Sequence, residues 1–133
     1  MKTALVLASR DHLERMELGL EFQNIITQQI EQGPAWTLLL DGEPAVVAGI
    51  MLLPAPGAGE YWSVTLDVAR RAPLAYCKAA VDLLGYAIGR YGLQYIQMTV
   101  DLLDNRALRF AEWLGFQRLN QVDGYWLLAR GGM

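Results

Sequence analysis

The stretch DNRALRFAEWLGF, residues 104–116, predicts a short capped helix between two strands near the end of the chain. Asp104 or Asn105 can accept hydrogen bonds from the N–H groups of the first helical turn. Gly115 can adopt the left-handed conformation that ends a helix, and Phe116 then begins the next strand. The apolar stripe of this helix, at helical spacing, consists of Ala107, Phe110, Ala111 and Leu114.

Working outward, the segment before this helix predicts a strand, a long helix and a second strand. GEYWSVTLDV at 59–68 and LQYIQMTV at 93–100 are the two strands. Pro73 suits the first position of a helix, and Gly92 suits its end. This unit predicts a parallel strand pair that is joined by a right-handed crossover.

The flanking segments supply the antiparallel strands. Lys2–Ala8 is expected as a strand, and Asp11 with Glu14 resembles a capping box that starts a pair of helices. WTLLLDGEPAVVAGIMLLP at 36–54 and QRLNQVDGYWLLAR at 117–130 each predict a hairpin around an Asp-Gly turn. The order β-α-α-β-β-β-α-β-α-β-β predicts one α/β domain, residues 1–133, with a mixed sheet and helices on both faces.

Composition narrows the classes of function. The chain is 53% hydrophobic and 19% charged, which excludes a disordered protein. Its formal charge of −3 gives no general attraction to nucleic acid, and no apolar run reaches the roughly 20 residues of a membrane helix. The brief apolar start is too short for a signal peptide, and the single cysteine, Cys77, fits a reducing compartment. A cytoplasmic protein without nucleic-acid or membrane partners is therefore expected.

The segment from Val100 to Phe116 resembles the GNAT superfamily of N-acetyltransferases. In that family a valine ends the fifth strand, an Asn follows four residues later, and the next helix ends in Gly-Phe; here Asp104 takes the place of the Asn. The resemblance implies acetyl transfer from acetyl-CoA to an amine, with the cofactor in a V-shaped opening between the fourth and fifth strands. The ending from Phe110 to Phe116 is also similar to GNAT-like proteins of tailed bacteriophages, which implies a place in the host cytoplasm.

The resemblance implies a pyrophosphate site at the start of the long helix, where N–H groups point outward. Arg70 and Arg71 are the candidate phosphate ligands. The segment VARRAPLAYCK at 68–78 departs from the family pattern, because Ala72 stands where glycine is usual and Pro73 lacks an N–H. The further cofactor-binding candidates are the main-chain groups of Val64, Leu66 and Val68, together with Asp104 and Asn105.

Glu60, at the start of the fourth strand, is the candidate catalytic base, and its alternative role is that of a solvated carboxylate. The family's proton-donating tyrosine falls at Ala111, which cannot donate a proton. The open substitutes are Tyr91, Tyr95, Tyr125 or water. Asp67 is expected to cap the long helix or to pair with Arg70 or Arg71.

The other polar and small residues are expected to be structural. His12 is interpreted as a surface residue and Cys77 as core, and no set of ligands with metal spacing is present. Gly85 and Gly89 could permit close backbone approach within the long helix. The expected partner is an amine or protein substrate, either a lysine or an N-terminus, and a homodimer is an open option. The alternative function is a GNAT-fold binding or structural protein that has lost catalysis.

Overall fold

The computed structural model describes residues 1–132 and contains one seven-stranded sheet in the order β1-β2-β3-β4-β5-β7-β6. The strands are β1 Thr3–Leu7, β2 Ala35–Leu40, β3 Glu43–Leu52, β4 Ala58–Thr65, β5 Tyr95–Asp101, β6 Gln117–Val122 and β7 Tyr125–Gly131. The helices are α1 Arg10–Arg15, α2 Leu20–Glu31, the 3-10 helix η1 Asp67–Arg71, α3 Pro73–Tyr91 and α4 Asn105–Trp113. The predicted mixed α/β fold is confirmed.

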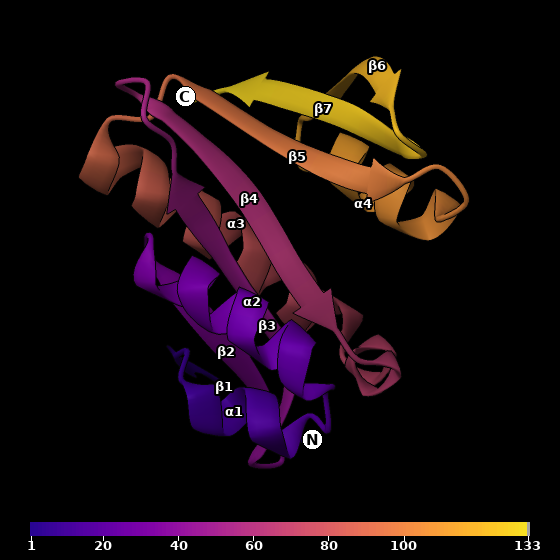
Figure 1. Ribbon diagram of the computed structural model, residues 1–133. Coiled ribbons are helices and arrows are strands. Elements are labelled where there is room, and N and C mark those ends of the chain that lie inside the picture. The colour runs from indigo at the N-terminus through magenta and orange to yellow at the C-terminus, as the bar shows by residue number, and fades with distance from the viewer. Residues whose placement is uncertain (133) are drawn as a thin grey trace.

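The sheet separates two apolar clusters. One cluster packs α1 and α2 against β2, β3 and β4, with Leu13, Ile26 and Val47 buried in it. The larger cluster packs α3 and α4 against the opposite side, and includes Leu84 and Phe116. We call the α1/α2 side the front face and the α3/α4 side the back face; Figure 1 is seen with α1 and α2 toward the viewer.

The central parallel pair, β4 and β5, is joined for a short distance only. Ala58, Gly59 and Glu60 pair with Tyr95, Ile96 and Gln97, and the two strands then diverge (Figure 1). Beyond this point β4 continues along β3, and β5 continues along β7. The facing edges of β4 and β5 therefore lack a strand partner over the last half of each strand.

The structure differs from the sequence prediction at three places. The fourth strand ends at Thr65 rather than at residue 68, because Asp67–Arg71 fold into η1. Gly85 and Gly89 were predicted to allow close approach, which is wrong: a Cβ built on either glycine meets nothing within 4 Å. Cys77 was predicted to be core but is half-buried.

The start of α1 also differs from the prediction. Its N-cap is Ser9, whose backbone N–H donates to His12 Nδ1 at 3.2 Å, whereas Asp11 forms a long ion pair with Arg15. The buried hydroxyl of Thr37 lies 2.8 Å from the same nitrogen. His12 is a surface residue, as interpreted, but it is half-buried and joins α1 to β2 through Thr37.

We expect His12 to make stability depend on pH. Burial and the nearby Arg15 lower its pKa from the ordinary 6.5, against a smaller opposing effect of Asp11. The unfolded chain, in which His12 has its ordinary pKa, therefore binds more protons than the folded chain. Lowering the pH from about 7.5 to about 5.5 thus favours the unfolded state, and the melting temperature should fall.

The matched control is His12→Gln, which keeps an acceptor at the third helical position but does not titrate. Its melting temperature, measured by circular dichroism across the same window, should fall less steeply. Parallel curves for the two proteins would show that His12 does not carry the pH dependence.

Candidate functional site

The divergence of β4 and β5 creates a cleft of about 590 Å³. Its lining comes from the end of β4, from η1, from residues 98–101 of β5, and from the starts of α3 and α4. The residues from β4 to η1 are Tyr61, Trp62, Ser63, Thr65, Leu66, Asp67, Ala69 and Arg70. The lining includes Trp62, which packs on the front face, and Tyr76, which packs on the back face. The gap between the strands is therefore approached from both sides of the sheet.

The N-terminus of α3 lies at this cleft without a side-chain cap in the described chain, and its first turn has no acidic residue. Pro73 occupies the first turn, so the N–H groups that follow it are free of a capping side chain. Arg70 lines the cleft immediately before this turn, and its side chain is 64% exposed. An uncapped helix N-terminus beside an arginine is a site for an anion.

A second arginine, Arg106, lines the cleft from α4. It has no carboxylate partner within residues 1–132, so its charge is available to a ligand. The sequence did not single out Arg106, and its place in the first helical turn after the cap Asp104 was the signal that could have found it. Arg71, by contrast, does not belong to the lining, so the structure favours Arg70 of the two predicted arginines.

Three carboxylates also line the cleft, and each has a local partner. Asp67 pairs with Arg70 at 3.6 Å, as predicted. Asp104 caps α4 by accepting from the Ala107 N–H at 3.0 Å, which confirms its capping role. Asp101 accepts from the N–H of Leu103 at 2.8 Å. The carboxylates of Asp101 and Asp104 are therefore each hydrogen-bonded to a backbone N–H group.

Glu60 lies at the vertex, where β4 and β5 part. Its Oε1 accepts from Gln97 Nε2 at 2.8 Å, and Gln97 Oε1 in turn lies 3.3 Å from the donating hydroxyl of Tyr95. The cross-strand pairing of Glu60 with Gln97 puts both side chains on the front face, with Trp62 next on that face of β4. The predicted base is thus half-buried and held by a chain of two hydrogen bonds.

The remaining predicted cofactor residues are only partly brought together. Leu66 lines the cleft, and its N–H donates a hydrogen bond to the carbonyl oxygen of Ala45 at 2.9 Å. The side chain of Val64 packs into the front cluster and that of Val68 into the back cluster, so only their main-chain groups could serve a ligand. Ala72 is the N-cap of α3, and Asn105 is the first residue of α4.

The tyrosines of the cleft are not the predicted ones. Tyr91, Tyr95 and Tyr125 do not line it, whereas Tyr61 and Tyr76 do. Burial, with a smaller effect of Tyr76, raises the pKa of Tyr61 far above its usual value, so this phenol stays protonated. The position of the family tyrosine is filled by a fully buried alanine.

Tyr76 reaches across the back of the cleft. Its hydroxyl lies 3.3 Å from Thr65 Oγ1, and its ring is 4.7 Å from that of Phe110 on α4. Tyr76 therefore joins α3, β4 and α4 and presents the half-buried hydroxyl of the cleft. Cys77, beside it, also lines the cleft.

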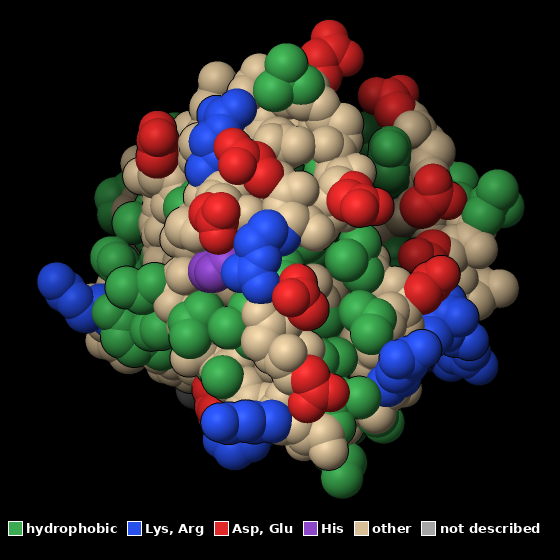
Figure 2. Space-filling view, turned by 90° about the horizontal axis from the view of Figure 1, so that it is seen from below, with side chains coloured by type: hydrophobic (Ala, Val, Ile, Leu, Met, Phe, Trp, Pro, Cys, Tyr) green, Lys and Arg blue, Asp and Glu red, His purple; other side chains and the backbone are tan. Residues whose placement is uncertain are grey.

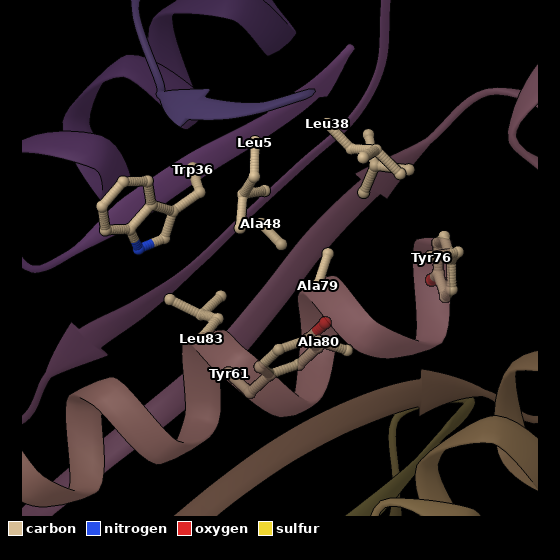
Figure 3. Close-up of a pocket in the computed structure, with 10 residues that line it drawn as sticks. Leu5, Trp36, Leu38, Ala48, Tyr61, Tyr76, Ala79, Ala80 and Leu83 are labelled. Atoms are coloured by element: carbon tan, nitrogen blue, oxygen red, sulfur yellow. The ribbon is translucent and has the colours of Figure 1, made fainter. Parts of the chain in front are cut away.

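A second, much smaller cavity lies between α3 and the sheet. Its volume is about 20 Å³, and Figure 3 shows apolar side chains such as Trp36 and Leu83 around it. A space of this size holds about one water molecule, so it is not a substrate site.

Three further features of residues 1–132, the surface charge, metal ligands and helix hydropathy, indicate no second site, so the cleft is the candidate site. Figure 2 shows acidic and basic side chains interspersed over the underside, with the single histidine between them and no broad patch of one sign. Among residues 1–132, no three His, Cys, Asp or Glu side chains converge to hold a metal ion. In the same range, no helix has the length and apolar character needed to cross a bilayer.

Comparisons with known proteins place the fold. No family model and no curated protein sequence matches the chain. Solved structures do match. An acetyltransferase of the GNAT family from Streptococcus pneumoniae superposes with a TM-score of 0.77 at 15% identity, over 98% of this chain and 99% of that one.

Two further structures agree. Ard1 from Thermoplasma volcanium gives a TM-score of 0.82 at 12% identity, over 100% of this chain and 99% of its own. The ribosomal-protein-S18-alanine N-acetyltransferase from Escherichia coli gives a TM-score of 0.77 at 14% identity, over 98% of this chain and 94% of that one. The chain therefore has the fold of the GNAT acetyltransferases.

We expect Asp104→Ala to lower the free energy of unfolding by about 1 kcal/mol, because the first turn of α4 loses its cap. Urea denaturation measures the change. Asn105→Ala is the matched control, since the Asn105 side chain makes no hydrogen bond in the described structure. Equal effects of the two substitutions would contradict the assignment of Asp104 as the cap.

Proposed function

We propose that the chain is an acetyl-CoA-dependent N-acetyltransferase that acts on an amine. The observation that carries the proposal is the parted β4–β5 pair, which opens onto an uncapped helix N-terminus on one side and meets Glu60 at its vertex. The likeness to solved GNAT acetyltransferases supports the same function.

The residues of the cleft fit the cofactor. Acetyl-CoA combines phosphates with a long arm that contains two amides, and the cleft offers a matching feature for each. The first turn of α3, Arg70 and Arg106 would hold the phosphates. The unpaired edge of β4 would bond the amides of the arm, because main-chain N–H and C=O groups without a strand partner require another one.

The proposed reaction uses protein groups on both the front and the back face of the sheet. Bound acetyl-CoA supplies the acetyl group as an activated thioester. Glu60 accepts the proton of the attacking amine at its carboxylate, which Gln97 holds in place. Free N–H groups of β4 would donate hydrogen bonds to the carbonyl oxygen of the thioester. Tyr76 presents a hydroxyl on the back side of the cleft and would be the proton donor to the thiolate leaving group.

The first test is calorimetric titration with acetyl-CoA. We expect micromolar binding that weakens roughly 10- to 100-fold in Arg70→Ala and in Arg106→Ala, since one charge-assisted hydrogen bond contributes about 1.5–3 kcal/mol. Arg90→Ala is the control, because Arg90 lies over Tyr91 at the far end of α3. The absence of heat and of a thermal shift at millimolar acetyl-CoA would refute the transferase and favour a GNAT-fold binding protein.

The second test concerns the base. Glu60→Gln should lower kcat about 10²- to 10⁴-fold, the usual contribution of a general base, and leave the Kd of acetyl-CoA unchanged. The amide keeps an oxygen that can accept from Gln97 but cannot take up a proton. Rates are measured by release of free CoA with an excess of amine. An unchanged kcat would indicate that Glu60 is a solvated carboxylate and not the catalytic base.

A further inference from the structure

The sheet formed by residues 1–132 has two edge strands, β1 and β6, which differ in how they are protected from further pairing. The pairing of β6 with β7 shifts register between Arg118 and Asn120, and Arg118 adds a charge to this edge. β1 has the sequence TALVL, without charge or proline, and it pairs with β2 without a register shift. Bulges, charges and prolines are the usual protection of an exposed edge, so β1 is the unprotected edge of the sheet.

The register with β2 determines which backbone groups of β1 point away from the sheet. The N–H of Ala8 donates to the carbonyl oxygen of Ala35 at 3.1 Å, and the N–H of Asp41 donates to that of Lys2 at 2.7 Å. Alternate residues of an antiparallel strand direct their backbone groups to the same side, so the even-numbered residues of β1 face β2. The odd-numbered residues therefore direct their N–H and C=O groups outward. These residues are Thr3, Leu5 and Leu7.

An apolar patch on the back face adjoins this edge. Leu7 is 69% exposed and lies opposite Trp36 of β2, whose ring meets that of Tyr86 edge to face, with centroids 6.0 Å apart. Leu5 is 38% exposed and lines the small cavity together with Trp36 (Figure 3). β1 lies on the lower side of the molecule in Figure 1, and the view from below shows hydrophobic side chains gathered beside the single histidine (Figure 2). Exposed apolar surface next to an unprotected edge indicates an interaction surface.

The outward groups of β1 are complementary to those of a second copy of the same strand. A twofold axis perpendicular to the sheet at Leu5 places Leu5 opposite Leu5 of the second copy, and Thr3 opposite Leu7. Each of these pairs can exchange two main-chain hydrogen bonds, because the outward groups lie at the same positions in both strands. The same axis keeps the back faces of both copies on one side, so the Leu5 side chains meet across the seam. Since β1 has no charged residue, this pairing brings no like charges of the strand together.

We propose that the chain forms a symmetric dimer through antiparallel pairing of β1 with β1 of a second copy, with the twofold axis at Leu5. The pairing joins the two sheets and covers Leu5 and Leu7. Because the seam is short, its area lies at the low end for specific interfaces, and we expect a dissociation constant on the order of 10 µM. β2 and β3 separate β1 from the β4–β5 cleft, so the proposal does not depend on the proposed function.

The alternative occupant of the edge is a strand of another protein, which pairs with an edge through the same main-chain groups. The symmetry about Leu5 favours the second copy, because a foreign strand has no need of outward groups that repeat evenly on both sides of one residue. In a solution of the purified chain a second copy is the only available strand. Self-association of the purified protein therefore distinguishes the two occupants.

Sedimentation velocity of the purified chain from about 1 to about 300 µM tests the proposal. We expect the mass to rise from monomer toward dimer over this range. Leu7→Arg should raise the dissociation constant of the dimer roughly tenfold or more, because it places a charge among the apolar side chains of the seam. Leu119→Arg is the matched control, since Leu119 is 55% exposed on the other edge strand, β6.

Circular dichroism verifies that both arginine variants fold. A chain that stays monomeric at every concentration would overturn the proposal. A dimer that is lost in Leu119→Arg and kept in Leu7→Arg would also overturn it, because the interface would then lie at β6.

A cysteine at the twofold axis tests the register. Directly opposed residues of a hydrogen-bonded antiparallel pair have Cα atoms about 5.5 Å apart, a distance that a disulfide spans. Leu5→Cys should therefore cross-link the dimer under mild oxidation. Leu7→Cys, although more exposed, should cross-link at least about tenfold more slowly, because the two Leu7 positions lie more than about 13 Å apart in this register.

Both cysteines are introduced into Cys77→Ser, so that the native thiol does not contribute to cross-linking. Non-reducing electrophoresis measures the rate at which the disulfide-linked dimer forms. A rate for Leu7→Cys equal to or above that for Leu5→Cys would contradict a twofold axis at Leu5.

Discussion

The structure depends on how β4 and β5 part after three paired residues. Each strand keeps its outer partner, β3 or β7, so the sheet stays continuous while an internal gap opens. Tyr61 of β4 and Phe116 are buried side by side in the back cluster, with ring centroids 6.3 Å apart. Unpaired backbone N–H and C=O groups at the two strand edges cost free energy. A ligand that forms hydrogen bonds with these groups would offset that cost.

The sheet presents different polar groups to the two sides of this gap. Arginines and an uncapped helix N-terminus face it from the back, and a held carboxylate stands at its front. The hydrogen-bond chain from Tyr95 through Gln97 holds Glu60 at the vertex. Sheet register, rather than any loop, therefore sets the geometry of the site.

Local patterns in the sequence predicted most of the fold, because caps, turns and periodicity are local properties. Gly115 has φ +97 at the end of α4, and Asp104 caps the same helix, as expected. The side chains of the site were harder to predict, because they depend on contacts between distant segments. His12 is held by Thr37, 25 residues away, and Tyr76 of α3 packs at the cleft against Phe110 of α4. Nothing in the spacing of these residues indicated either contact.

The two alanines that depart from the family pattern have different physical consequences. Ala72 has φ −136 and ψ 63, a conformation with negative φ that does not require glycine, so the helix N-terminus forms without it. Ala111 is fully buried, and its carbonyl accepts from the Phe116 N–H at 3.1 Å. A phenol there would need the space that the core now fills, so any proton donor must come from another element. The hydroxyl of Tyr76 on α3 lies at the cleft, 3.3 Å from Thr65 Oγ1 of β4, and so reaches this region without depending on α4 for its position in the chain.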